Sequence, residues 1–214
     1  MTDATDGDRH RQAGGHGGLT AYQAQLRDRM LAAPVVPAPE PWRPVFEGCA
    51  LVGGLLGIGF ATHPGSGRDL VMVVSADGHG LFDAVTGERI ARDRDPGPDA
   101  EECGRDAPPG LSCTGLGPIA GRRVHVAGLL GGALHTSSGD GWVLEVVSPD
   151  WPHDRVLLSR GSSMPHRAPH GEGWWHIFHS SYSELRAVGF SPSGRTLAVA
   201  TSSDVTLWTR APAG

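Results

Sequence analysis

Short apolar runs alternate with glycine-, serine- and Asp-Gly-rich turns from about Trp42 to the end of the chain. Runs of Val, Leu, Ile and Phe bounded by turn residues indicate β-strands rather than helices. The clearest example lies near the C-terminus, where Leu185–Phe190, Leu197–Thr201 and Val205–Trp208 read as three consecutive strands. Between the first two, Ser191–Gly194 has the proline and glycine of a tight turn.

Two further stretches follow the same pattern less clearly. The first unit contains the expected strands Gly57–Phe60, Leu70–Ser75, Gly80–Asp83 and Glu88–Ala91. The middle unit contains the expected strands Arg123–Ala127, Trp142–Val147 and Arg155–Leu158. The turn residues Asp77, Asp140 and Asp204 are 63 and 64 residues apart. This regular spacing predicts three repeating sheet units.

The N-terminal part differs from the rest of the chain in its composition and hydrophobic pattern. Residues 1–18 are polar and glycine-rich, so we expect a disordered tail. Residues 19–41 combine a short helix with a stiff proline-rich linker. The helix is expected to rest an apolar stripe on the main body, and its members recur at three- and four-residue steps: Leu19, Tyr22, Leu26, Met30 and Leu31. Residues 42–211 form the predicted β domain.

The stretch FSPSGRTLAVATSSDVTLW resembles the inner part of a WD40 repeat, and SADGHGLFDAVTGERI resembles the later strands of another. The resemblance implies an all-β, WD40-like or propeller-like fold with three to four irregular blades. It also implies a buried, hydrogen-bonded tetrad within the last repeat. Carried over by position, the tetrad is His179, Thr201 or its neighbour Ser202, Asp204 and Trp208. Otherwise the chain resembles bacterial proteins from high-GC genomes.

Three units are few for a closed propeller, which has four to eight blades. The sequence is therefore compatible with several arrangements of the sheets: four short blades, an open ring completed by a second copy, or sheets packed face to face. The last strand would leave an unpaired edge at Trp208. We expect a strand from Pro44–Phe46 or Ala50–Val52 to join it and to close the structure between the termini.

Charge and composition exclude several classes of function. The net charge of −5 argues against nonspecific binding to nucleic acid or to anionic membranes. No apolar run is long enough to span a bilayer, and no secretory signal pattern begins the chain. The three cysteines, Cys49, Cys103 and Cys113, are odd in number and favour a reducing, cytoplasmic location. The sequence has no lysine, which excludes Schiff-base and phosphate-loop lysine chemistry.

Histidines gather between residues 166 and 179. Imidazole and carboxylate groups suit zinc, so the candidate ligands are His166, His170, His176 and Glu172. Their spacing fits no single helix, because prolines and glycines interrupt it. The alternative is a surface loop followed by a strand, with His179 as a buried structural donor.

A second candidate surface lies around Trp151, between two prolines in an expected turn, with His153 and Arg155 close by in sequence. Tryptophan and arginine dominate interface hot spots, although Trp151 could also cap the edge of the sheets.

The function favoured by the sequence is therefore a non-catalytic protein-binding or scaffold module, such as one that holds a toxin or enzyme in check. The alternative is a metal-dependent hydrolase that uses residues 166–179, with zinc as its only cofactor. A protein partner is expected, and a homo-oligomer is compatible with an incomplete ring.

Overall fold

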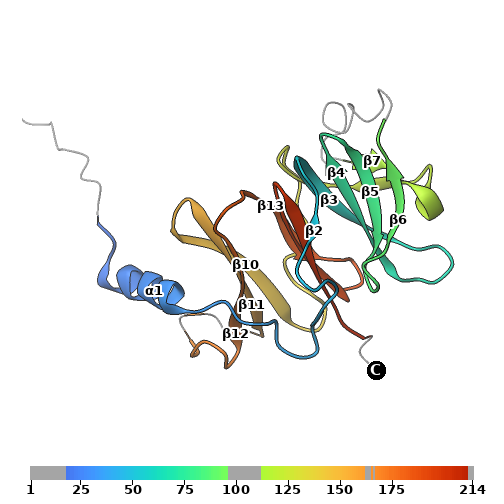
Figure 1. Ribbon diagram of the computed structural model, residues 1–214. Coiled ribbons are helices and arrows are strands. Elements are labelled where there is room, and N and C mark those ends of the chain that lie inside the picture. Colours follow the sequence, from blue (N-terminus) through green and yellow to red (C-terminus); the bar gives the residue numbers. More distant parts are fainter. Residues whose placement is uncertain (1–17, 96–111, 162–164, 166, 212–214) are drawn as a thin grey trace, which may run out of the picture.

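The computed structural model describes residues 18–95, 112–161, 165 and 167–211 (Figure 1). It is an all-β structure with one α-helix, and every strand pairing is antiparallel. The helical elements are α1 (Ala21–Ala32) and the short 3₁₀ helix η2 (Gly117–Ile119). The strands are β1 (Arg43–Pro44), β2 (Ala50–Leu51), β3 (Leu55–Thr62), β4 (Asp69–Ser75), β5 (Gly78–Asp83), β6 (Arg89–Asp93), β7 (Ser112–Thr114), β8 (Arg123–His125), β9 (Ala127–Gly128), β10 (Trp142–Asp150), β11 (His153–Arg160), β12 (Trp174–Ser180), β13 (Leu185–Phe190), β14 (Thr196–Thr201) and β15 (Asp204–Thr209). No helix within the described ranges is long and apolar enough to cross a membrane.

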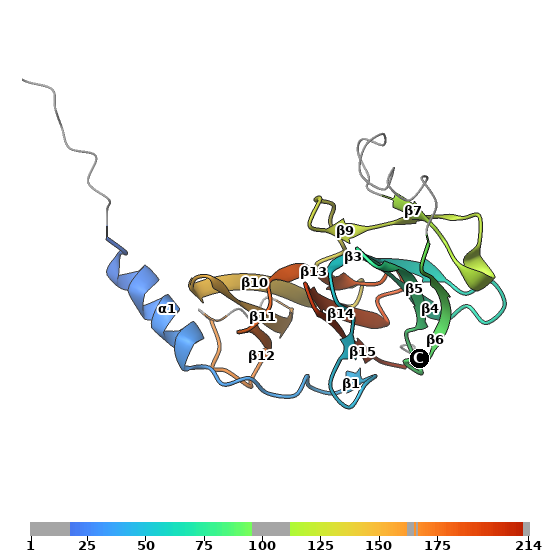
Figure 2. The same cartoon turned by 45° about the horizontal axis from the view of Figure 1, so that its top comes forward.

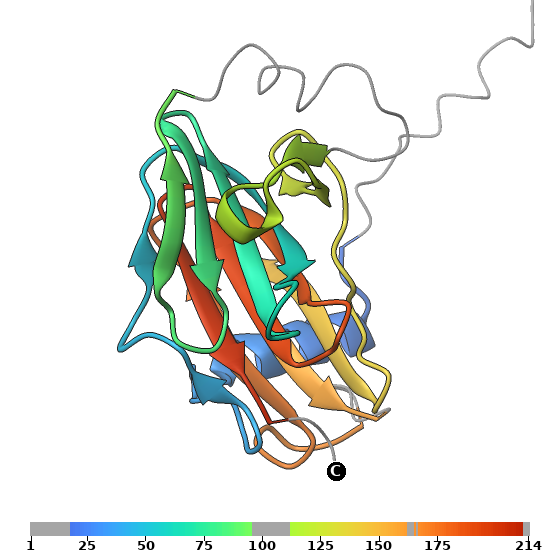
Figure 3. The ribbon, with the colours of Figure 1, turned by 90° about the vertical axis from the view of Figure 1, so that its right-hand side faces the viewer.

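Three sheets are stacked face to face (Figure 2), and Figure 3 shows the first sheet in front of the third. The first sheet has the strand order β6-β5-β4-β3-β9, and the second has the order β10-β11-β12. The third sheet consists of β13, β14 and β15, with β1 and β2 paired to β15. Separate apolar clusters join the third sheet to the first and to the second, and the β7–β8 hairpin covers the outer face of the first sheet. None of the sheets closes into a ring within the part of the chain that is described.

Strand β14 shows why the third sheet lies in the centre. All six of its residues are buried. Leu197 and Val199 pack toward the second sheet, whereas Ala198 and Ala200 pack toward the first. Successive side chains of a strand point to opposite faces, so the sequence Leu-Ala-Val-Ala is apolar on both faces. Such a strand is stable only when both of its faces are covered.

The N-terminal strands complete the third sheet, as expected from the sequence. Arg43 of β1 pairs with Thr209, and Leu51 of β2 pairs with Asp204, at opposite ends of β15. Trp42, just before β1, is only 2% exposed. Its ring centroid lies 6.0 Å from that of Trp142 and 5.6 Å from that of Phe190. The linker is therefore anchored in the core between the second and third sheets.

Glycines make room for a segment that crosses the sheets between β8 and β10. A Cβ atom at Gly59 would lie 2.1 Å from the carbonyl oxygen of His125, and one at Gly189 would lie 2.2 Å from Leu134 Cβ. The backbone N–H of Phe190 donates to the carbonyl oxygen of His135 next to Leu134. Because a side chain at either glycine would collide with this segment, the close approach depends on both.

The structure corrects the predicted composition of the middle unit. Residues 123–127 do not join the second sheet, because β8 pairs with β7 and β9 pairs with β3. Strand β12, the source of His179, belongs to the second sheet rather than to the last unit. Asp77 lies between the second and third strands of a meander and Asp204 begins the third strand of another, but Asp140 precedes the first strand of its sheet. The regular spacing of the three aspartates therefore does not mark equivalent positions.

The predicted helix forms, and its apolar stripe is covered only in part: Leu26, Met30 and Leu31 are half-buried, whereas Leu19 and Tyr22 are exposed. Polar contacts also attach the helix. Arg27 donates to the carbonyl oxygen of Pro149, and Arg29 donates to that of Pro165. The expected tail of residues 1–18 lies outside the described residues except for Gly18.

We expect Gly189→Ala to lower the free energy of unfolding by about 1–3 kcal/mol, because the added methyl group overpacks the crossing at Leu134. Gly53→Ala is the matched control, since a Cβ there meets nothing within 4 Å. We expect it to change stability by less than about 0.5 kcal/mol. Urea denaturation of both variants checks this, and equal losses would contradict the crossing.

Candidate functional site

Within the described residues, most turns that connect strands of the three sheets lie at one of two ends of the stack. Leu55 pairs with Ser75 and its backbone N–H donates to the carbonyl oxygen of Ser202, which places the β4–β5 and β14–β15 turns together. We call this the Leu51 end. It consists of the segments 52–54, 75–78, 129–131, 150–153, 181–184 and 201–204. The opposite end, which we call the Arg43 end, consists of the segments 62–69, 83–88, 140–141, 190–196 and 209–211.

Exposed apolar side chains lie on several separate segments of the Leu51 end. Leu51 is 85% exposed, Trp151 is 83% exposed and Tyr182 is 77% exposed. Leu129 and Leu130 are also exposed here, on the turn after β9. At the Arg43 end, Val85 is the one large apolar side chain exposed among the described residues. The two ends of the stack therefore differ in chemical character.

Tyr182 and Cys49 lie near the start of β15. The charge of Asp204, followed by burial, raises the pKa of Tyr182 above its ordinary value. Burial raises the pKa of Cys49, and the charge of Asp204 adds to the effect. Cys49 therefore stays a protonated thiol near neutral pH and is a poor nucleophile. This part of the Leu51 end is suited to contact rather than to covalent chemistry.

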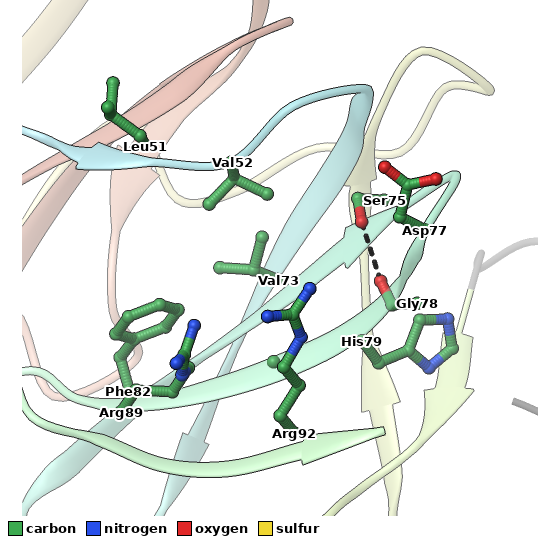
Figure 4. A pocket seen from close by; sticks show the side chains of 11 residues that line it. Leu51, Val52, Val73, Ser75, Asp77, Gly78, His79, Phe82, Arg89 and Arg92 are labelled. Atoms are coloured by element: carbon green, nitrogen blue, oxygen red, sulfur yellow. Dashed lines mark hydrogen bonds between the residues drawn. The ribbon is translucent and has the colours of Figure 1, made fainter. Parts of the chain in front are cut away.

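A hollow of about 80 Å³ lies beside Leu51, between β2 and the face of the first sheet (Figure 4). Val52 lies over it, and Gly80 and Phe82 belong to its floor. The guanidinium groups of Arg89 and Arg92 rise from β6 into this space.

A β-bulge places both arginines on the same face. Arg92 pairs with Gly80 and Arg89 pairs with Phe82, with an irregularity between Leu81 and Phe82. Residues three apart on a regular strand point to opposite faces. The bulge leaves Ile90 as an extra residue, so the two side chains point to one side. Neither arginine forms an ion pair in the described part of the chain.

A larger cleft of about 460 Å³ lies at the Arg43 end, but its arginines are mostly engaged. Arg68 forms an ion pair with Asp83, and Arg210 forms one with Asp140. Arg195 donates to the carbonyl oxygen of Gly67. These contacts join neighbouring segments, so this end has a structural role.

The same end contains a buried carboxylate that sequence reasoning missed. Asp69 Oδ2 accepts hydrogen bonds from Ser191 Oγ at 2.8 Å, from Ser193 Oγ at 2.6 Å and from Thr196 Oγ1 at 2.9 Å. These bonds join the first sheet to the β13–β14 turn of the third. In the sequence, Ser-Pro-Ser indicated only a turn, because Asp69, which accepts its hydrogen bonds, lies far away along the chain.

The structure does not bring the four predicted tetrad residues together. Thr201 and Asp204 do meet, because the backbone N–H of Asp204 donates to Thr201 Oγ1 at 3.2 Å. Trp208 is buried four residues farther along β15, about 13 Å away along an extended strand. His179 lies in the second sheet, where its Nε2 is 4.0 Å from Asp150 Oδ2.

The proposed zinc ligands are also separated. His166 lies outside the described residues. His170 Nε2 accepts from the backbone N–H of His176 at 3.3 Å, and Glu172 is exposed on a turn. His176 Nδ1 lies 2.9 Å from the carbonyl oxygen of Ala33, its hydrogen-bond acceptor. No group of side chains in the described ranges is arranged to hold a metal ion.

Of the three proposed interface residues, Trp151 is exposed, His153 is half-buried and Arg155 is buried. Arg155 donates to the carbonyl oxygen of Met30 at 3.0 Å and contacts Asp150. Arg155 thus holds the end of α1 against the second sheet and is unavailable to a partner.

Buried histidines make stability depend on pH. Burial is the main cause that lowers the pKa of His79, His176 and His179 below 6.5. The folded state therefore favours neutral imidazole, so this stability is present above pH 6.5 and is lost as pH falls toward the lower folded pKa. We expect the free energy of unfolding to fall between pH 7.5 and 5, and to fall less steeply in His176→Gln. Urea denaturation across this range checks it, and an unchanged slope would contradict it.

Comparison with known proteins adds no relative. No family model, curated protein or solved structure matches this chain.

Proposed function

We propose that the chain is a non-catalytic protein-binding module that engages its partner through the Leu51 end. The observation that carries the proposal is the exposure of two large apolar side chains beside Asp204 at the start of β15: Leu51, at the end of β2, and Tyr182, between β12 and β13. Exposed apolar groups that gather on one surface mark interaction sites. Leu51 is held by the pairing of β2 with the mostly buried strand β15, so this part of the surface has a rigid support.

The alternative of a metal-dependent hydrolase receives no such support. His170 and His176 direct ring nitrogens to backbone groups, and Glu172 lies apart from them on an exposed turn. The lowered pKa of His176 keeps it neutral, but its role at Ala33 is structural.

We further propose that the sheets are divergent WD40-like blades. In support, the first and third sheets each contain a meander of consecutive strands, and the third packs against the first. The pairing of β1 and β2 with β15 joins the two ends of the chain in one sheet, as closure of such a repeat requires.

The binding proposal is tested by partner capture from the native host, followed by affinity measurement with the captured protein. We expect the double variant Leu51→Ser/Tyr182→Ser to weaken binding at least about tenfold, because it removes two exposed anchors. The matched control is Val35→Ser/Val85→Ser, which changes two exposed valines away from the Leu51 end. The control should bind like the wild type. Equal affinities of all three proteins would contradict the proposal.

A further inference from the structure

The arginine hollow beside Leu51 points to the chemistry of a partner. Arg89 and Arg92 lie on one face of β6 because of the bulge, and Figure 4 shows both guanidinium groups entering the same space. Arginine presents several N–H donors in a planar fork that matches a carboxylate or phosphate group. Two such forks in one hollow are a site for an oxyanion.

The remaining charges around the hollow favour a bound group that carries a single negative charge. Asp77, on the β4–β5 turn, is the carboxylate that lines it. Burial lowers the pKa of His79, and Figure 4 shows its ring pointing away from the two guanidinium groups. The formal charge of the lining is therefore +1. A carboxylate balances it, whereas a phosphate dianion would leave a net negative charge in the hollow.

The size and position of the hollow agree with a side chain rather than with a free metabolite. Its volume of about 80 Å³ is well below the roughly 300–1,000 Å³ of pockets that enclose whole small molecules. Gly80 opposite Arg92 has no side chain, and a Cβ there would meet only Phe82, at 3.5 Å. Leu51 and Val52 supply an apolar border. A short acidic side chain of a partner protein fits this space, and the partner's backbone then covers Leu51.

We propose that Arg89 and Arg92 bind the side-chain carboxylate of an aspartate or glutamate in the protein partner. This rests on the proposed function, since the partner is the one that engages the Leu51 end. The acidic residue fixes the register of the complex, while Leu51 and Tyr182 supply its apolar contacts.

The first arm of the test examines the hollow itself, with sodium acetate as the probe at constant ionic strength. Side-chain Nε–Hε resonances are followed by NMR. We expect acetate to shift the signals of Arg89 and Arg92 saturably and to leave Arg43 unmoved. Binding should disappear in Arg89→Gln/Arg92→Gln; both arginines are exposed, so the fold should persist. The proposal is overturned if acetate moves neither signal, or if inorganic phosphate binds more tightly than acetate.

The second arm uses the captured partner. We expect Arg89→Gln/Arg92→Gln to weaken binding at least about tenfold and to flatten its salt dependence, because charge-assisted hydrogen bonds are lost. Arg43→Gln is the matched control and should bind like the wild type. If the arginine variant binds normally while Leu51→Ser/Tyr182→Ser does not, the acidic contact is wrong but the proposed function stands. If the reverse holds, the apolar anchors are wrong and the acidic contact stands.

Discussion

The need to cover both faces of the third sheet governs this structure. In β14, Leu197 and Val199 point one way and Ala198 and Ala200 point the other, and all are buried. Exposing either face would return apolar area to water, at about 25 cal/mol for each Å². The first and second sheets are therefore required neighbours, and the small alanine side chains allow the first to approach closely.

This stacking determines where function can lie. With the central sheet covered, solvent meets the stack mainly at its turns and at the outer faces. Polar contacts tie neighbouring segments together at the Arg43 end, where three hydroxyl groups donate to Asp69 and Arg210 pairs with Asp140. The Leu51 end instead exposes apolar side chains, and the hollow beside Leu51 contains two arginines without ion pairs among the described residues. We therefore infer that the Arg43 end stabilises the stack and that the Leu51 end serves recognition.

The N-terminal strands contribute both to the stability of the central sheet and to the candidate interface. Strand β1 brings Trp42 into the core between the second and third sheets, and β2 places Leu51 on the surface beside the hollow. One short segment thus completes the central sheet and supplies part of the candidate interface. A change that loosens β2 should therefore affect stability and binding together.

Local patterns predicted the strands well. The runs from Leu185 to Trp208 form the expected meander, and the N-terminal segment joins it as inferred from its unpaired edge. Assignment of strands to sheets depends on packing between distant residues, which is why Arg123–Ala127 was misplaced. Arg89 and Arg92 point into the same hollow because of a β-bulge, and no glycine, proline or other turn residue in the sequence indicates that bulge. The buried role of Arg155 arises from a helix far away in sequence.

Native-state hydrogen exchange tests the central claim most directly, since it reports the free energy needed to open each segment. If the third sheet is covered on both faces, the backbone amides of Ala198 and Val199 should exchange only through global unfolding, with the highest protection in the chain. The amides of β6, at the edge of the first sheet, should exchange through smaller openings. Protection of β14 no greater than that of β6 would contradict the account.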